Sequence, residues 1–226
     1  MPPIYPTPSA AGGEAQCSHG RASSIDRPVR VLSCRFVVWL GGEGPIATRE
    51  HAEPGDPSPW VVRFAELIPP GGTVLDVASG GGRHTRFFLE RGYRVVAVDR
   101  DVSRIADLVG NPQLDVVPVD LEKDEPFPFY DRRFEGVVVT NYLYRPLLTD
   151  LVGAVGPGGV LIYETYARGH ERFGPPSNPD FLLETGELLE AVRGRLDVIA
   201  YEDAMVKEPR PAVVQRICAI NRRDVA

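Results

Sequence analysis

The chain has 226 residues, enough for one domain with a short extension. Hydrophobic residues make up 43% of it and charged residues 25%, which argues against a membrane-embedded or wholly disordered protein. The net charge of −6 gives no sign of the broad basic surface that supports sequence-independent nucleic-acid binding, although a local basic patch is not excluded. We therefore expect no nucleic-acid partner.

The cysteine content and the apolar runs bear on metal sites and location. Cys17, Cys34 and Cys218 are too few and too scattered for a disulfide framework or a zinc site, so we predict no metal centre. No run near the N-terminus has the length of a spanning helix or of an export signal. We expect a cytoplasmic protein without a membrane partner.

The first part of the chain differs in composition from the rest. Residues 1–54 are rich in Pro, Gly, Ala and Ser and lack sustained strand or helix periodicity. We predict a largely disordered N-terminal extension there and a domain over residues 55–222. Two alternatives stay open: residues 29–40 dock as an extra strand, or the extension precedes the true start of the protein.

From Trp60 onward, short apolar runs alternate with helical segments, a pattern typical of βα units around a mainly parallel sheet. Helical or amphipathic segments are predicted at residues 61–68, 82–91, 102–109, 147–155 and 181–192. Strands are predicted at residues 73–78, 94–99, 114–119, 134–140 and 160–166. Gly156–Gly159 is predicted to stop a helix and form a turn.

Two further strands are predicted at the end of the domain, at residues 196–206 and 212–221. The linker Lys207–Pro211 between them is short. A parallel return needs about a dozen residues or more, so the two strands are expected to pair as an antiparallel hairpin.

A glycine-rich turn, Asp76–Gly82, joins the first predicted strand to the following helix. Glycines let the backbone approach a ligand closely and adopt positive φ, and the helix start behind them offers free N–H groups. A tight turn without a ligand would have the same composition.

The second predicted strand ends in Asp99, about twenty residues after the glycine turn. A carboxylate there can accept hydrogen bonds from both ribose hydroxyls of an adenosine. An acid at a strand end can also cap the next helix, but its distance from the glycines favours ribose binding.

Residues 74–85, VLDVASGGGRHT, and 91–101, RGYRVVAVDRD, closely resemble motif I and the following acidic loop of class I S-adenosylmethionine-dependent methyltransferases. They are similar in particular to the tellurite-resistance-type small-molecule branch. The resemblance implies a Rossmann-like α/β fold, a three-layer sandwich around a seven-stranded, mainly parallel sheet with an antiparallel terminal hairpin. It also implies S-adenosylmethionine as cofactor, bound over the carboxyl ends of strands one, two and four.

The same resemblance implies a set of cofactor-binding residues: Asp76, Ala78, Ser79, Gly80, Gly82, Asp99, Arg100, Asp120, Leu121 and Asn141. Within it, the glycine turn would line the methionine moiety, Asp99 would hold the ribose, and Asp120 with Leu121 would contact the adenine. Asp120 could instead be a turn residue. Ala78 stands where many members have glycine, and its methyl group is tolerated if φ is negative.

The segment after the fourth strand, Thr140–Pro146, is where the family presents the acceptor to the methyl group. Methyl transfer mainly requires alignment and a water-poor pocket, with a base where the acceptor needs one. The catalytic residue is not determined by the sequence; the candidates are Asn141, Tyr142 and Tyr144, whose carbonyls or ring faces could stabilise a sulfonium. Each tyrosine could equally be a packed aromatic.

Two nucleic-acid branches of the family are disfavoured. The segment lacks the Asn/Asp-Pro-Pro-aromatic run of amino-methylating enzymes, and no cysteine lies between Cys34 and Cys218 to act as a nucleophile. We therefore expect a small-molecule acceptor.

A long loop rich in Pro and Gly, residues 167–180, follows the fifth strand, and such loops are often functional. We predict that it acts as a lid. His170, Glu171 and Arg172 are candidate substrate contacts, although each could simply be solvated. His84 is expected to be structural or a surface residue.

The predicted function is S-adenosylmethionine-dependent methyl transfer to a small molecule. A nicotinamide-dependent oxidoreductase is a rival, but its G-x-G-x-x-G pattern would place Thr85 at the third glycine. A catalytically silent nucleoside-binding or protein-interaction module on the same fold is another, because a fold alone does not prove activity. The acceptor and the oligomeric state are not specified.

Overall fold

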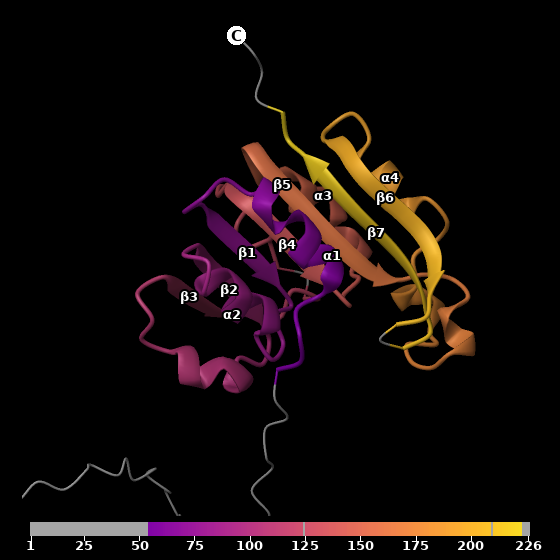
Figure 1. Ribbon diagram of the computed structural model, residues 1–226, viewed down its shortest axis with the longest axis horizontal. Helices are drawn as coiled ribbons and strands as arrows, with labels where there is room; N and C mark the ends of the chain where they lie inside the picture. Colours follow the sequence, from indigo (N-terminus) through magenta and orange to yellow (C-terminus); the bar gives the residue numbers. More distant parts are fainter. Residues whose placement is uncertain (1–53, 124, 209, 223–226) are drawn as a thin grey trace, which may run out of the picture. The chain divides into compact units, whose positions relative to one another are not determined.

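A seven-stranded sheet forms the centre of the computed structural model, which describes residues 54–123, 125–208 and 210–222 (Figure 1). The strand order is β3-β2-β1-β4-β5-β7-β6. The strands are β1 (Thr73–Val77), β2 (Arg94–Asp99), β3 (Leu114–Pro118), β4 (Phe134–Thr140), β5 (Val155–Tyr166), β6 (Asp197–Val206) and β7 (Ala212–Ile220). The predicted extension over residues 1–54 lies, except for its last residue, outside the described ranges.

The direction of the strands confirms the predicted topology. β7 is antiparallel to both of its neighbours, β5 and β6, whereas the pairs from β3 to β5 are parallel. The predicted Rossmann-like sheet with an antiparallel terminal hairpin is therefore present.

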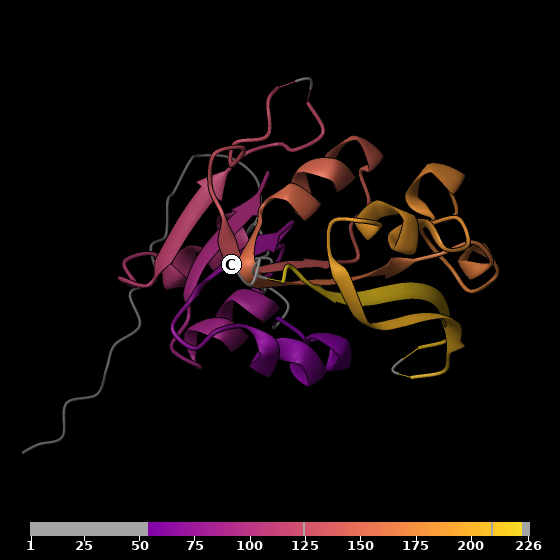
Figure 2. The ribbon, with the colours of Figure 1, turned by 90° about the horizontal axis from the view of Figure 1, so that it is seen from above.

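Helices cover both faces of the sheet (Figure 2). One face carries α1 (Pro59–Phe64), the 3₁₀ turn η1 (Ala65–Leu67) and α2 (Arg83–Leu89); the other carries η3 (Arg145–Leu147), α3 (Leu148–Gly153) and α4 (Glu187–Val192). Further 3₁₀ turns are η2 (Ser103–Leu108), η4 (His170–Arg172) and η5 (Pro179–Phe181). The Ser58 hydroxyl caps α1 by accepting a hydrogen bond from Trp60 N–H at 3.1 Å, and Pro59 suits the first helical position.

Alternating strand side chains build two apolar cores. On β1, Val74 packs with the aromatic residues of α1 and α2, while Leu75 and Val77 pack with the α3 and α4 side chains. Both faces are buried, which is why the central strands are almost continuously apolar.

Three predicted elements differ from the structure. The segment 102–109, predicted as a helix, is the 3₁₀ segment η2, with non-helical dihedral angles at Ile105. β5 begins at Val155, so Gly156–Gly159 lies inside that strand rather than in a separate turn. The pairing steps from Phe134 with Val155 to Gly136 with Val160, which makes these residues a bulge. The amphipathic segment 181–192 is α-helical only from Glu187, because Gly186 at φ +76° precedes the helix.

Within the described ranges, no helix is both long and apolar enough to cross a membrane.

Gly136 in β4 leaves no room for a side chain. A Cβ atom there would lie 2.7 Å from Ile68 Cδ1 and 3.2 Å from Val74 Cγ2. We expect Gly136→Ala to lower the free energy of unfolding by about 1–3 kcal/mol through overpacking, measured by urea denaturation. Gly55→Ala, where a Cβ meets nothing within 4 Å, is the control. Equal stability of the two variants would contradict this packing.

Candidate functional site

A cleft of about 360 Å³ lies at the carboxyl ends of β1 to β4. Its lining contains five predicted cofactor-binding residues together with the acceptor candidate Tyr142: Ala78, Asp99, Arg100, Asp120 and Leu121. Val119, Glu122 and Phe181 complete the lining and were not predicted. Val119 and Glu122 adjoin the predicted pair after β3, but no sequence signal distinguished Phe181, which comes from η5.

Asp99 connects the glycine turn to the end of β2. Its Oδ2 accepts a hydrogen bond from Gly80 N–H at 2.8 Å, and its Oδ1 accepts one from Asp101 N–H at 2.9 Å. The N–H of Ser103, the first residue of η2, donates instead to Asp101 Oδ1 at 3.0 Å. Asp99 therefore does not cap η2, and each of its oxygens has a further lone pair for a ligand.

The glycine turn is a left-handed reversal directly after β1. Gly80 and Gly82 adopt φ of +55° and +73°, as the composition suggested. Ala78 has φ +52°, so the condition of negative φ under which its methyl group was expected to fit does not hold. The chain reverses at once so that Ser79 N–H can donate to Val98 O at 3.1 Å. A left-handed alanine costs about 1–2 kcal/mol.

Asp76 lies beneath the turn and is not part of the cleft lining. The residue is only 2% exposed, and its carboxyl group accepts a hydrogen bond from Thr85 Oγ1 at 2.6 Å. Burial raises the pKa of Asp76 from its ordinary value of 3.8 to about 6. Asp76 thus fixes the turn to α2, and its contact with a cofactor stays a prediction.

Two buried hydroxyl groups lack a hydrogen-bond partner among the described residues: Ser79 Oγ in the glycine turn and Tyr142 Oη in the cleft wall. A buried polar atom without a partner costs about 1–3 kcal/mol, so the Tyr142 hydroxyl in the cleft wall points to a ligand. Ser79 is not part of the cleft lining, and its contact with a cofactor stays a prediction.

The segment after β4 places its three candidates differently. Tyr142 lines the cleft, and its carbonyl accepts a hydrogen bond from Tyr163 Oη at 2.9 Å. Burial raises the pKa of Tyr142, so the phenol stays protonated at neutral pH. Asn141 is exposed, with φ +55°, and donates its N–H to Glu164 O. Tyr144 is half-buried against the core and lies outside the cleft lining.

The two histidines of the described residues, His84 and His170, have structural partners. His84 is 2% exposed and accepts a hydrogen bond from Ser58 N–H at Nε2, and burial lowers its pKa to about 3. His84 is thus a neutral structural residue, one of the two roles expected. His170 is 5% exposed and stacks on Tyr166 at 4.0 Å between ring centroids.

Of the other two loop candidates, Glu171 accepts a hydrogen bond from Gly169 N–H, and Arg172 Nε donates to Gly169 O. These bonds stay within the loop. Neither residue, nor His170, lines the cleft. Substrate contacts from these side chains, and the action of the loop as a lid, stay predictions.

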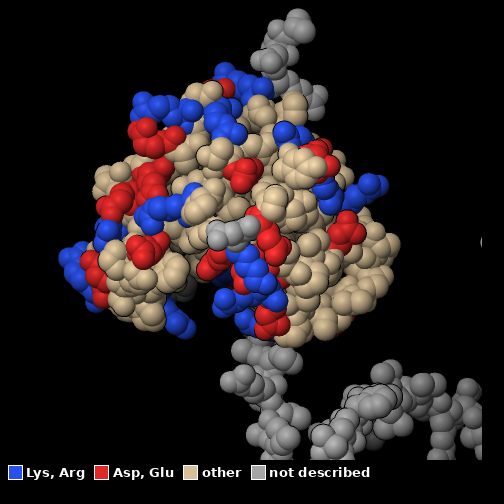
Figure 3. Space-filling model, turned by 180° about the vertical axis from the view of Figure 1, so that it is seen from behind, with Lys and Arg blue, Asp and Glu red and all other residues tan. Residues whose placement is uncertain are grey.

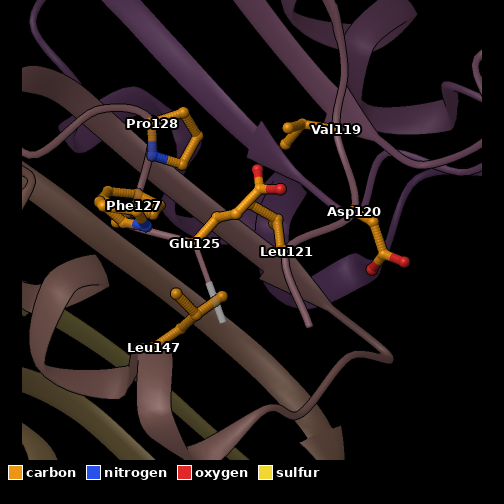
Figure 4. A pocket seen from close by; sticks show the side chains of 8 residues that line it. Val119, Asp120, Leu121, Glu125, Phe127, Pro128 and Leu147 are labelled. Atoms are coloured by element: carbon orange, nitrogen blue, oxygen red, sulfur yellow. The ribbon is translucent and has the colours of Figure 1, made fainter. Parts of the chain in front are cut away.

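A second, much smaller hollow lies behind the segment after β3 (Figure 4). It encloses about 10 Å³, room for a single water molecule at most. Figure 4 shows the Glu125 side chain reaching toward Val119 while Asp120 points away. Phe127, Pro128 and the residues beside them therefore pack against the segment after β3, and the hollow is too small for a cofactor.

Charge in the main cleft is predominantly negative. Asp99, Asp120 and Glu122 line it against the one cation of the lining, Arg100. On the face shown in Figure 3, acidic and basic side chains of the described residues are intermixed, without a continuous basic surface. Within the described ranges, no three His, Cys, Asp or Glu side chains are grouped to hold a metal ion.

Comparison with known proteins identifies the fold. No protein-family model matches the chain. Solved structures similar to the chain include TehB from Haemophilus influenzae (TM-score 0.57, 18% identity, 72% of this chain and 61% of that one). They also include the 1,6-didemethyltoxoflavin-N1-methyltransferase of Burkholderia thailandensis (TM-score 0.54, 20% identity, 72% and 76%). The fold is that of the class I S-adenosylmethionine-dependent methyltransferases. The resemblance inferred from the glycine turn and the acidic loop is thereby confirmed for the fold.

A curated relative found by sequence comparison is also named as a methyltransferase. The chain is 33% identical over 157 residues to ribosomal RNA small subunit methyltransferase H of Gemmatimonas aurantiaca, covering 64% of this chain and 45% of the relative. The chain thus spans less than half the length of the curated relatives it matches.

Asp76 gives this methyltransferase fold a characteristic pH dependence. Between pH 4 and 6 the native state binds a proton at Asp76 that the unfolded state releases, so the contribution of this residue to stability falls as pH rises. Asp76→Asn removes that loss. We therefore expect the unfolding free energy of the variant, relative to the parent, to rise by about 2.4 kcal/mol from pH 4 to 7. Urea denaturation at a series of pH values measures the difference in unfolding free energy between variant and parent. His84 makes stability rise with pH, but it does so in both proteins, so its effect cancels in the difference. A constant difference would contradict the buried, proton-binding carboxyl group.

Proposed function

We propose that the protein binds S-adenosylmethionine in the cleft beside the glycine turn and transfers its methyl group to a small-molecule acceptor. The observation that carries the proposal is the position of Asp99, which holds Gly80 N–H at 2.8 Å and lines the cleft together with Asp120 and Leu121. The Burkholderia methyltransferase of the same fold was solved with S-adenosylhomocysteine and 1,6-didemethyltoxoflavin bound, which supports the cofactor and the acceptor class.

The residues of the cleft fit this cofactor. Its volume of about 360 Å³ lies within the usual range of small-molecule sites. In the proposed arrangement, the free lone pairs of Asp99 accept the ribose hydroxyls, and Asp120 with Leu121 bounds the adenine. Tyr142 Oη, which has no hydrogen-bond partner among the described residues, supplies a polar contact in the cleft wall.

When bound, the cofactor supplies an electrophilic methyl group on a cationic sulfur atom. The negative wall formed by Asp99, Asp120 and Glu122 favours a cation in the cleft. Tyr142 keeps its proton at neutral pH, so its contribution is a hydrogen bond and a ring face rather than a base. The chain therefore acts chiefly by aligning the two reactants and by excluding water.

A small-molecule acceptor is favoured over RNA, although the Gemmatimonas relative is named for ribosomal RNA. RNA binding rests on phosphate contacts from clustered Lys and Arg, whereas Arg100 is the one cation of a lining that holds three carboxylates. The rival oxidoreductase function is disfavoured because β7 is antiparallel to its neighbours and Thr85 stands at the position of the third glycine.

Activity is tested by incubating the protein with isotopically labelled S-adenosylmethionine and a panel of small aromatic, thiol and carboxylic acceptors, with a ribosomal RNA arm in parallel. We expect transfer of label to a small molecule. Transfer to RNA alone would contradict the acceptor class, and tight cofactor binding without any turnover would favour a catalytically silent module.

Asp99→Ala should weaken the binding of S-adenosylhomocysteine about 10- to 100-fold, since it removes charge-assisted hydrogen bonds of about 1.5–3 kcal/mol. Isothermal titration calorimetry measures the affinity, and a thermal melt verifies the fold. Asp101→Asn is the matched control, because Asp101 is close in sequence but lies outside the cleft lining. If both variants bound S-adenosylhomocysteine with affinities within twofold of the parent, Asp99 would not be part of the cofactor site.

A further inference from the structure

Phe181 is the large apolar side chain of the cleft that comes from a distant part of the chain. It ends η5, in the connection after β5, yet it lines the same cleft as Ala78 and Asp99. Its side chain is 45% exposed. An exposed aromatic ring on the wall of a cleft can contribute to binding, because a ligand that covers the ring buries its apolar surface.

Arg145 fixes the backbone on both sides of this ring. Its Nη1 donates to Asp180 O at 2.7 Å, and its Nη2 donates to Leu182 O at 2.8 Å, so the residues before and after Phe181 are both held. Its Nε and Nη2 also donate to the two carboxylate oxygens of Glu187, at 2.7 and 3.0 Å. Such a bidentate pair gives directional rigidity as well as energy.

The local segment adds two further restraints. The Asn178 side chain accepts a hydrogen bond from Asp180 N–H at 3.1 Å, and Glu187 Oε2 accepts one from Glu184 N–H at 2.8 Å. The backbone is therefore restrained by hydrogen bonds on both the N-terminal and the C-terminal side of Phe181.

The same arginine belongs to the segment that carries Tyr142. Arg145 begins η3 three residues after Tyr142, at the end of the acceptor segment. The side chain of Arg145 thus ties the connection after β4 to the connection after β5. Tyr142 itself is held by a separate bond, from Tyr163 Oη to its carbonyl at 2.9 Å.

We propose that Phe181 forms the wall of the acceptor subsite, that Arg145 is its positioning residue, and that the acceptor is an uncharged aromatic molecule. This inference rests on the proposed methyl transfer. The predicted cofactor residues of the cleft come from the ends of β1 to β3, whereas Tyr142 and Phe181 come from the connections after β4 and β5. Three carboxylates against one arginine disfavour an anionic acceptor, and two rings favour an aromatic one.

The proposal is tested with N-phenyl-1-naphthylamine, an uncharged aromatic fluorophore, added to protein saturated with S-adenosylhomocysteine. Phe181→Ala should raise the dissociation constant of the fluorophore at least tenfold and leave that of S-adenosylhomocysteine within twofold. The control is Phe173→Ala, whose ring is 42% exposed on the same connection but lies outside the cleft lining. Inorganic phosphate should not displace the fluorophore.

Arg145→Lys tests positioning, because lysine keeps the charge but cannot make the four directional bonds of the guanidinium. With 4-fluorophenylalanine at position 181, the parent should give one narrow ¹⁹F resonance, and the lysine variant a broadened or shifted one with at least fivefold weaker fluorophore binding. If Arg145 were merely structural, Arg145→Lys would lower the melting temperature of the protein and leave the ¹⁹F resonance of position 181 unchanged.

The outcomes separate this inference from the function on which it rests. If the parent does not bind S-adenosylhomocysteine, the proposed function fails and the acceptor subsite fails with it. If the parent binds it but Phe181→Ala weakens cofactor and fluorophore equally, Phe181 belongs to the cofactor site and only this inference is overturned. Unchanged fluorophore binding in Phe181→Ala, or displacement by phosphate, would also overturn it.

Discussion

The hydrogen bond from Gly80 N–H to Asp99 Oδ2, 2.8 Å long, joins the glycine turn to the end of β2, and the rest of the site is arranged around it. To reach that carboxylate the chain must reverse immediately after β1, which places Ala78 at φ +52°. The strain is compensated by the pairing of β1 with β2 and by the buried bond between Thr85 and Asp76. A carboxylate that orders the turn while keeping free lone pairs is suited to hold a ligand against it.

The opposite side of the cleft is organised by a different device. There the guanidinium of Arg145, in the connection after β4, donates hydrogen bonds to two carbonyls of the connection after β5 and to Glu187. The side chains of Arg145 and Glu187 are 36% and 19% exposed, so part of the pair is shielded from water and weakened less by salt than a surface pair. The geometry around Gly80 and Asp99 thus depends on the sheet, whereas the position of Phe181 depends on Arg145 and on local bonds of its own segment.

Sequence patterns predicted the elements whose signals are local. β2 and β4 have the predicted bounds because buried parallel strands are continuous apolar runs ended by polar residues. Gly156–Gly159 was assigned to a turn because the same residue types form turns and bulges, and only pairing with Phe134 distinguishes them. Ala78 shows the limit for backbone geometry, because its side chain gives no sign of positive φ. Phe181 and Arg145 were missed because their contacts join segments distant in sequence.

The most direct test of the account is a crystal structure of the protein with S-adenosylhomocysteine. The account predicts difference density in the cleft at the carboxyl ends of β1 to β4, with the ribose hydroxyls on Asp99, the adenine beside Leu121 and the Gly80 to Asp99 bond intact. Density at another surface, or a ribose that does not contact Asp99, would contradict the account.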